Sequence, residues 1–124
     1  MLTKIKLFLH GFVHAGRGLL LAFKTERNFR IHTAATLVIA AALCVVPLAV
    51  WEKVILLLVV AAVLVLELIN SVLERMVDLV KPRLHQYVGD IKDLMAGAVL
   101  VAAVFAVLVG IVILGPHVKL LFNL

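Results

Sequence analysis

Long apolar runs separated by short polar segments fill the last three quarters of the chain. Residues 33–50 carry no charge, residues 54–66 are wholly apolar, and residues 94–115 are again uncharged. The second run continues as a helical pattern to about residue 80, with acids along one side. A helix needs roughly 20 mostly apolar residues to cross the hydrocarbon core of a bilayer. The pattern therefore predicts three membrane spans, at about 33–50, 54–80 and 94–115.

Proline, glycine and one short polar segment mark the expected ends of these spans. Pro47 marks either an exit or a kink near the end of the first span. Trp51, Glu52 and Lys53 are expected to form a tight connection to the second span, with Trp51 suited to the membrane interface. Gly115 followed by proline is a helix stop and is expected to end the third span.

The first 30 residues have a different pattern, because basic residues and glycines interrupt the apolar ones. At about 100° per residue, one face collects apolar side chains, namely Ile5, Phe8, Leu9, Phe12, Leu19, Leu20 and Phe23. The opposite face collects polar ones, namely Lys6, His10, His14, Arg17 and Lys24. This pattern predicts an amphipathic helix over about residues 3–30 that lies in the membrane surface.

Composition excludes the soluble alternatives. Of 124 residues, 65% are hydrophobic and 15% charged, whereas a soluble domain is about half apolar and about a quarter charged. A small soluble fold has too much surface to bury so many apolar side chains. A disordered chain contains far fewer apolar residues than this one. We therefore expect an all-α membrane protein, with residues 1–124 as one unit. Its single cysteine, Cys44, excludes an internal disulfide.

The net charge of +5 indicates orientation in the membrane. Basic residues concentrate before the first span and in the connection at about 81–93, and few lie elsewhere. Basic loops stay on the cytoplasmic side. We expect a cytoplasmic N-terminus and an outside C-terminus. The excess of positive charge suits anionic lipid, and we expect no nucleic acid partner.

Acidic side chains in the second predicted helix are candidates for chemistry. Glu67, Glu74 and Asp78 fall within roughly 40° of one another on a helix, with Asn70 and Ser71 beside them. Glu67 is expected inside the cytoplasmic membrane boundary, where carboxylates are costly and usually functional. A divalent cation or a raised pKa would relieve the repulsion between them.

The alternative for these acids is structural. They could pair with Arg75, Lys81 or Arg30 at the level of the lipid headgroups. Such pairs would need no ligand.

Oxygen ligands at this density suit Mg²⁺, which binds one or two carboxylates together with phosphate. The chain has no glycine-rich phosphate loop, so point charges and metal would have to hold a nucleotide. Lys92 and Asp93 at the start of the third span, and Glu26 before the first, are expected at the same membrane depth as Glu74. A lysine and an acid at the start of a helix usually interact only with that helix end. The hypothesis of a nucleotide site therefore depends on their expected convergence with Glu74.

Small residues in the third span favour association between helices. Ala102, Ala106 and Gly110 recur every four residues, a spacing that permits close packing in membranes. Three spans make a thin bundle, and an acidic stripe is buried more easily between subunits. We therefore expect a homo-oligomer.

Two motifs resemble those of a known family. Glu67-Leu-Ile-Asn70-Ser-Val-Leu-Glu74, with Asp78 four residues on and Lys92-Asp93 after that, resembles the signature of small bacterial lipid kinases. These form the prokaryotic diacylglycerol kinase and undecaprenol kinase family. The segment from Glu26 to His32 looks like the family's approach to its first span, and the resemblance extends over about residues 11–101. It implies a surface helix and three spans per subunit, a homotrimer, and active sites shared between subunits at the cytoplasmic face of the bacterial inner membrane.

The resemblance also implies the reaction and the roles of individual residues. The reaction transfers the γ-phosphate of ATP to a lipid hydroxyl with Mg²⁺, and Glu67 is the general base. The metal ligands are Glu26 and Glu74. The residues implied in ATP binding are His14, Glu26, Glu74, Arg83, Leu84, His85, Lys92 and Asp93. Those implied near the lipid are Asn28, Phe29, Arg30, Glu67 and Ala96, and Asn70 and Asp78 support the site.

The chain departs from the family pattern at two places. Ser71-Val72-Leu73 stands where the family often has Ser or Thr followed by Ala-Ile, which adds bulk. Gly89 stands where many undecaprenol-type members have a second lysine.

The acceptor and the class of function each have alternatives. The segment from Glu26 to His32 looks more like the undecaprenol branch, so undecaprenol is the expected acceptor and diacylglycerol the alternative. A small proton-coupled transporter that uses Glu67 as its proton site is the alternative outside the kinases. A third class of function is a structural membrane subunit whose acids form ion pairs at the membrane interface.

Overall fold

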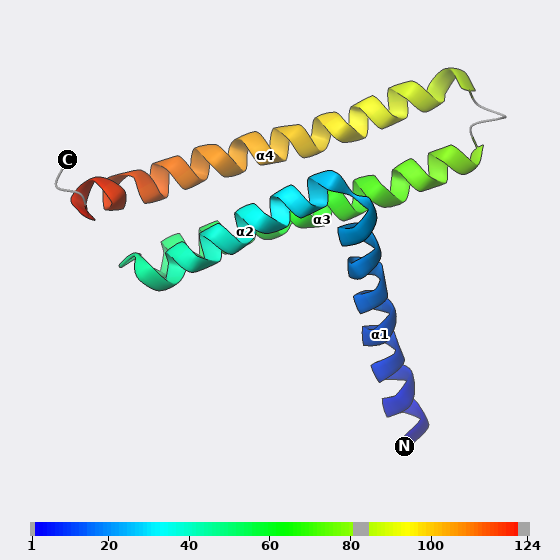
Figure 1. The fold of residues 1–124 in the computed structure, drawn as a ribbon, viewed down its shortest axis with the longest axis horizontal. Coiled ribbons are helices and arrows are strands. Elements are labelled where there is room, and N and C mark those ends of the chain that lie inside the picture. Colours follow the sequence, from blue (N-terminus) through cyan, green and yellow to red (C-terminus); the bar gives the residue numbers. More distant parts are fainter. Residues whose placement is uncertain (1, 81–84, 122–124) are drawn as a thin grey trace.

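The computed structural model describes residues 2–80 and 85–121, and these ranges hold four helices and no strand. The helices are α1 (Leu2–Thr25), α2 (Arg27–Val45), α3 (Val50–Val80) and α4 (His85–Leu121). In Figure 1, α2, α3 and α4 run along one common direction, and α1 leaves them at a steep angle. This arrangement suits a surface helix attached to a bundle of spans.

The three aligned helices are long and apolar enough to cross a membrane. The qualifying stretches are Arg27–Val45, Val50–Leu79 and Tyr87–Leu120. Three predicted spans are thus confirmed. Each is part of a longer or shifted helix, because the predicted limits followed uncharged runs, whereas the helices also include the polar residues that flank those runs.

The break between α1 and α2 falls at Glu26, earlier than the expected end of the surface helix near residue 30. Glu26 has an extended backbone, with φ −99° and ψ 115°. Arg30 Nη1 donates to the carbonyl oxygens of Phe23 and Lys24 at 3.2 and 3.1 Å. These carbonyls belong to the last turn of α1, which has no further helical turn to pair with. Arg30 therefore stabilises the corner from the α2 side.

Two boundary predictions are wrong. Trp51, Glu52 and Lys53 lie in the first turn of α3, so the connection to α2 is formed by residues 46–49 instead. The helix α4 continues through Pro116 to Leu121. Proline removes one backbone hydrogen bond, but spanning helices tolerate it where their neighbours support the backbone. Pro47 does lie at an exit, in the connection after α2.

The central helix of the fold is α3, which packs against both α2 and α4. At the end away from α1, Leu48, Leu56 and Ile113 form a buried apolar cluster. Most other large apolar side chains are exposed, including those of Leu58, Phe105 and Val112. In a membrane this surface contacts lipid tails or other subunits.

Glu52 fixes the start of α3. Its Oε2 accepts a hydrogen bond of 2.7 Å from the backbone N–H of Ala49, and it lies 3.6 Å from His117 Nε2 of α4. A glutamate or glutamine at the third helical position commonly binds the capping residue in this way. We expect Glu52→Ala to destabilise the protein by about 1 kcal/mol. Glu52→Gln keeps the hydrogen bond and is the control.

The measurement is the unfolding midpoint of the two variants in the same detergent micelles. A midpoint for Glu52→Ala equal to that of Glu52→Gln would contradict the capping role.

Candidate active site

The polar residues of α3 lie at the end nearest to α1. Glu67 is only 2% exposed, and Asn70 and Ser71 are also buried. Ser71 Oγ donates to the backbone oxygen of Glu67 at 2.9 Å. Glu67 lies roughly 25 Å along α3 from Val50 at 1.5 Å per residue, within a hydrocarbon core about 30 Å thick. This distance is compatible with the expected position of the carboxyl group at membrane depth, which stays a prediction.

The carboxyl group of Glu67 has one close partner on α2. His32 Nε2 lies 3.1 Å from Glu67 Oε1. Oε1 is nevertheless a buried oxygen that makes no hydrogen bond with any described group. A buried acceptor without a hydrogen bond is costly and calls for an explanation. An incoming hydroxyl group would satisfy it.

Glu74 lies about two helical turns beyond Glu67 on the same face of α3. Asn70 Nδ2 donates to Glu74 Oε1 at 2.9 Å. The amide oxygen of Asn70 is buried and makes no hydrogen bond with a described group. The negative charges of Glu74 and Glu26 both act on the Glu67 carboxyl group. Three of the predicted acids thus share one electrostatic neighbourhood.

Glu26 reaches this neighbourhood from the α1–α2 corner. Arg75 Nη2 of α3 donates to Glu26 Oε1 at 3.0 Å and to Thr25 Oγ1 at 2.7 Å. If the acids had only a structural role, Arg75 was expected to pair with the acids of α3. It pairs instead with Glu26 at the corner between α1 and α2. Lys81 lies outside the described residues. The pair joins the surface helix to α3 just beyond the buried acids.

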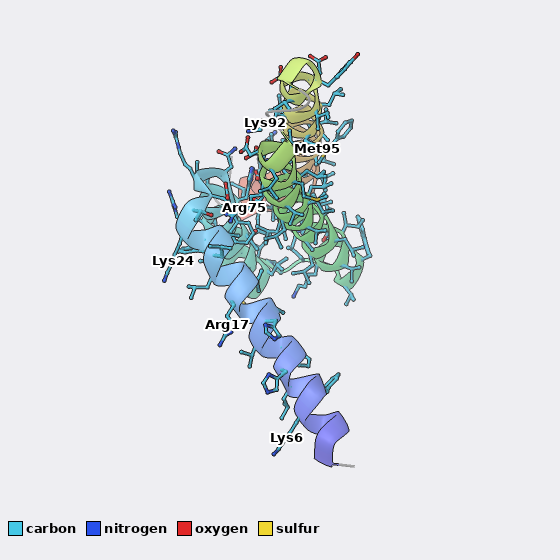
Figure 2. All side chains as sticks on the ribbon, turned by 90° about the vertical axis from the view of Figure 1, so that its right-hand side faces the viewer. Lys6, Arg17, Lys24, Arg75, Lys92 and Met95 are labelled. Atoms are coloured by element: carbon cyan, nitrogen blue, oxygen red, sulfur yellow. The ribbon has the colours of Figure 1, made fainter. Side chains whose placement is uncertain are left out.

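Lys92 approaches the same acids from α4. Its Nζ donates to Asp78 Oδ1 at 2.7 Å, and the charge of Glu74 also acts on it. Figure 2 shows Lys92 and Arg75 on the same side of the helices that carry them. Asp93 lies elsewhere, in an open hollow on α4 with Asp90 and Gly97. Neighbouring residues of a helix point about 100° apart, so only Lys92 faces α3.

The remaining predicted residues are dispersed in a single chain. His14 is exposed on α1, roughly 18 Å of helix before Glu26. In the first turn of α2, Phe29 is buried while Asn28 and Arg30 are exposed, and Ala96 is exposed on α4. Arg83 and Leu84 lie outside the described residues, as does the side chain of His85.

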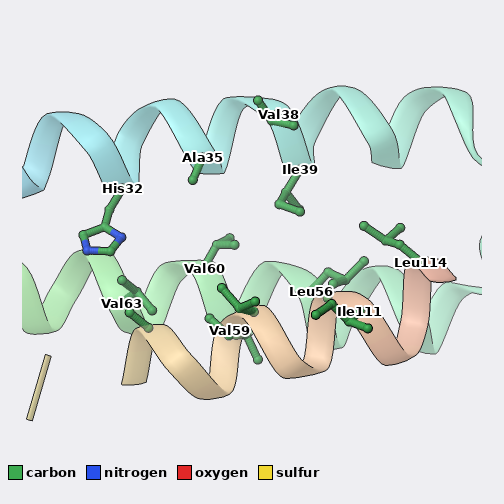
Figure 3. A pocket seen from close by; sticks show the side chains of 14 residues that line it. His32, Ala35, Val38, Ile39, Leu56, Val59, Val60, Val63, Ile111 and Leu114 are labelled. Atoms are coloured by element: carbon green, nitrogen blue, oxygen red, sulfur yellow. The ribbon is translucent and has the colours of Figure 1, made fainter. Parts of the chain in front are cut away.

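An apolar groove of about 600 Å³ runs between α2, α3 and α4. Its lining is aliphatic except for His32, and it includes Ala35, Ile39, Val63 and Gly110. Figure 3 shows the His32 ring between the ribbons of α2 and α3. The groove therefore has one polar end, which contacts Glu67.

His32 is the site residue that sequence reasoning did not single out. In the sequence it is only the last residue of the segment that resembles the family. A signal was present, since a polar side chain next to the uncharged run 33–50 needs a partner for the same reason that Glu67 does.

Oxygen donors are available for a hard cation near Glu74. Its carboxylate and the unsatisfied amide oxygen of Asn70 are both of the type that Mg²⁺ prefers. Within residues 2–80 and 85–121, no group of three or more His, Cys, Asp or Glu side chains is arranged to hold a metal. Magnesium commonly binds only one or two protein carboxylates and takes further oxygens from phosphate, so the residues fit a metal–nucleotide complex.

Known proteins with similar sequences indicate the family of this chain. The sequence model of the family described as prokaryotic diacylglycerol kinase matches residues 13–114. An undecaprenol kinase of Bacillus subtilis is 37% identical over 114 residues, which are 92% of this chain and 93% of that protein. A diacylglycerol kinase of Synechocystis is 41% identical over 109 residues, 87% of this chain and 62% of that protein.

A diacylglycerol kinase of Escherichia coli K12 is also similar, with 30% identity over 104 residues, 84% of this chain and 85% of that protein. The family match covers most of the chain and includes the whole acidic face of α3. The chain therefore belongs to the prokaryotic diacylglycerol kinase family and is a lipid kinase.

Proposed function

We propose that the protein transfers the γ-phosphate of ATP to the hydroxyl group of undecaprenol, with Glu67 as the general base. One observation carries the role of Glu67. Its Oε1 is buried and makes no hydrogen bond with a described group, and it lies on a spanning helix where we expect it at membrane depth. A lipid hydroxyl group that stays in the bilayer can reach an acceptor at that depth.

The reaction balances on these groups. The lipid oxygen forms a bond to the γ-phosphorus while the bond between that phosphorus and the β–γ bridging oxygen breaks. ADP leaves, and the hydroxyl proton passes to the Glu67 carboxylate. Phosphoryl transfer requires mainly positioning and charge neutralisation, so the base needs only to be placed at the hydroxyl group.

We assign Glu74 and Glu26 to the metal–nucleotide complex and Lys92 to the phosphates. Bound Mg²⁺ would neutralise phosphate charge. Glu74 offers an oxygen ligand supported by Asn70, whereas Glu26 already binds Arg75. Lys92 carries a positive charge next to Asp78 and within the influence of Glu74. Asp78 then supports the site by directing the lysine.

We infer that a homotrimer completes the ATP site. His14 and Asp93 are implied in ATP binding, yet in one chain they lie away from Glu67 and Glu74. Gly97 and Ala98 of α4 line the same hollow as Asp93, and such small residues permit close approach of another helix. Subunit association would bring these residues to a neighbour's acids, together with Arg83, Leu84 and His85.

Undecaprenol is the preferred acceptor because the undecaprenol kinase of Bacillus subtilis aligns with 92% of this chain. Diacylglycerol is the alternative, from the names of the other relatives. Family membership favours either over the proton-coupled transporter considered from the sequence. We place the protein in the bacterial inner membrane with a cytoplasmic N-terminus, because soluble ATP must reach the end of α3 that carries Glu74.

The test is phosphate transfer by the purified protein in mixed micelles. Labelled ATP and Mg²⁺ are supplied with either undecaprenol or diacylglycerol, and kcat/KM is measured for each lipid. The proposal predicts the higher value for undecaprenol. Absence of label in both lipids would overturn the function, and a higher value for diacylglycerol would overturn the acceptor.

Glu74→Gln tests the metal assignment. Loss of the carboxylate charge is expected to raise the Mg²⁺ concentration for half-maximal activity by roughly tenfold or more. The measurement is a Mg²⁺ titration at saturating lipid. Glu52→Gln, at the other end of α3, is expected to titrate like wild type. An unchanged requirement in Glu74→Gln would remove Glu74 from the metal site.

A further inference from the structure

The Glu67 carboxyl group is not held by its neighbours on α3. Ser71 bonds the backbone oxygen of Glu67 rather than its carboxylate, and Asn70 directs its amide to Glu74. The contact described for the carboxylate comes from α2, where His32 Nε2 lies 3.1 Å from Oε1. A glutamate side chain has several free torsions, so without this contact its carboxylate could adopt other positions.

The surroundings of His32 make the contact effective. Its side chain is 25% exposed against 2% for Glu67, and the groove around it is otherwise aliphatic. Electrostatic attraction is stronger in such a low-dielectric region than in water. The nearby charges of Glu74 and Glu26 repel the Glu67 carboxylate, whereas His32 attracts it.

The geometry also leaves Glu67 available for chemistry. His32 Nε2 lies 3.1 Å from Oε1, yet that oxygen makes no hydrogen bond with a described group. A partner that formed a strong hydrogen bond would occupy the oxygen that must accept the substrate proton. His32 can hold the carboxylate toward α2 without saturating it.

We propose that His32 is a positioning residue for Glu67, holding the buried carboxylate at the polar end of the apolar groove where the lipid hydroxyl group arrives. This proposal rests on the proposed role of Glu67 as the base. It assigns His32 no contact with ATP. Its loss should therefore lower kcat and leave the KM for ATP unchanged.

Two amide substitutions test the position of the histidine nitrogen. The amide nitrogen of glutamine extends from the backbone about as far as Nε2, whereas that of asparagine stops near the depth of Nδ1. We expect His32→Asn to lower kcat by roughly 10- to 100-fold, the effect of a misplaced reacting group. His32→Gln should retain most of the wild-type kcat. Both variants should keep the wild-type KM for ATP.

His117→Asn is the matched control, because His117 also lies beside a glutamate of α3, at the other end of the bundle. It should leave kcat unchanged. Unfolding midpoints are measured for all variants. If His32→Asn does not fold, the comparison of His32→Gln with wild type decides, and a loss of more than tenfold there contradicts the proposal.

Equal kcat values for His32→Asn and wild type would overturn the proposal. So would equal losses in both His32 variants accompanied by a raised KM for ATP, the result expected of a general structural role. These results are distinct from failure of the proposed function, which would appear as absent transfer by wild type or as full activity of Glu67→Gln.

Discussion

Glu67→Gln is expected to lower lipid phosphorylation by roughly 10²- to 10⁴-fold, the usual contribution of a positioned general base. Glutamine has nearly the same shape but cannot accept the hydroxyl proton. The carboxyl group of Glu67 is buried beside His32 rather than beside Lys92. ATP binding should therefore remain near the wild-type level.

Two measurements separate these effects. Initial rates with labelled ATP give the transfer, and the fluorescence of a nucleotide analogue gives the binding. Glu52→Gln is the matched control, since it makes the same substitution in the same helix at the opposite end. Loss of nucleotide binding by folded Glu67→Gln would show that this residue has another role.

Lys92→Met is expected to lower kcat/KM for ATP by roughly 10²-fold or more, the effect of removing one group that stabilises transition-state charge. Lys92 donates to Asp78 at 2.7 Å and lies within the influence of Glu74. Methionine keeps the length of the side chain and removes its charge. Both the KM for ATP and kcat should therefore change.

The controls for Lys92 use the same helix and the same charge. Lys119→Met alters an exposed lysine at the far end of α4 and should leave ATP kinetics unchanged. Lys92→Arg keeps the charge with a different geometry and should be intermediate. A wild-type KM for ATP in Lys92→Met would refute phosphate binding by this lysine.

The spans could be predicted from the sequence because lipid imposes a simple requirement of length and apolar composition. The break at Glu26 could not, since Arg75 and Arg30 fix it through contacts from two other helices. The continuation of α4 through Pro116 could not be predicted either. A proline stop is a local tendency, and helices that span a membrane tolerate proline.

The acids that we propose for the site are conspicuous in the sequence because a carboxylate at membrane depth is costly. Their partners are not. Lys92 and Asp93 are adjacent in sequence and were expected to act as a pair, but only the fold decides which of them faces α3. His32 became significant only when α2 and α3 were placed side by side.

The most direct test of the central claim is formation of undecaprenyl phosphate from ATP by the protein in lipid nanodiscs. Labelled lipid and released ADP are measured together for wild type, Glu67→Gln and Glu52→Gln. For wild type and for Glu52→Gln, we predict one ADP released for each labelled lipid formed, with similar yields from the two proteins. Glu67→Gln should form almost no labelled lipid. Absence of labelled lipid from wild type, or equal yields from all three proteins, would contradict a lipid kinase whose base is Glu67.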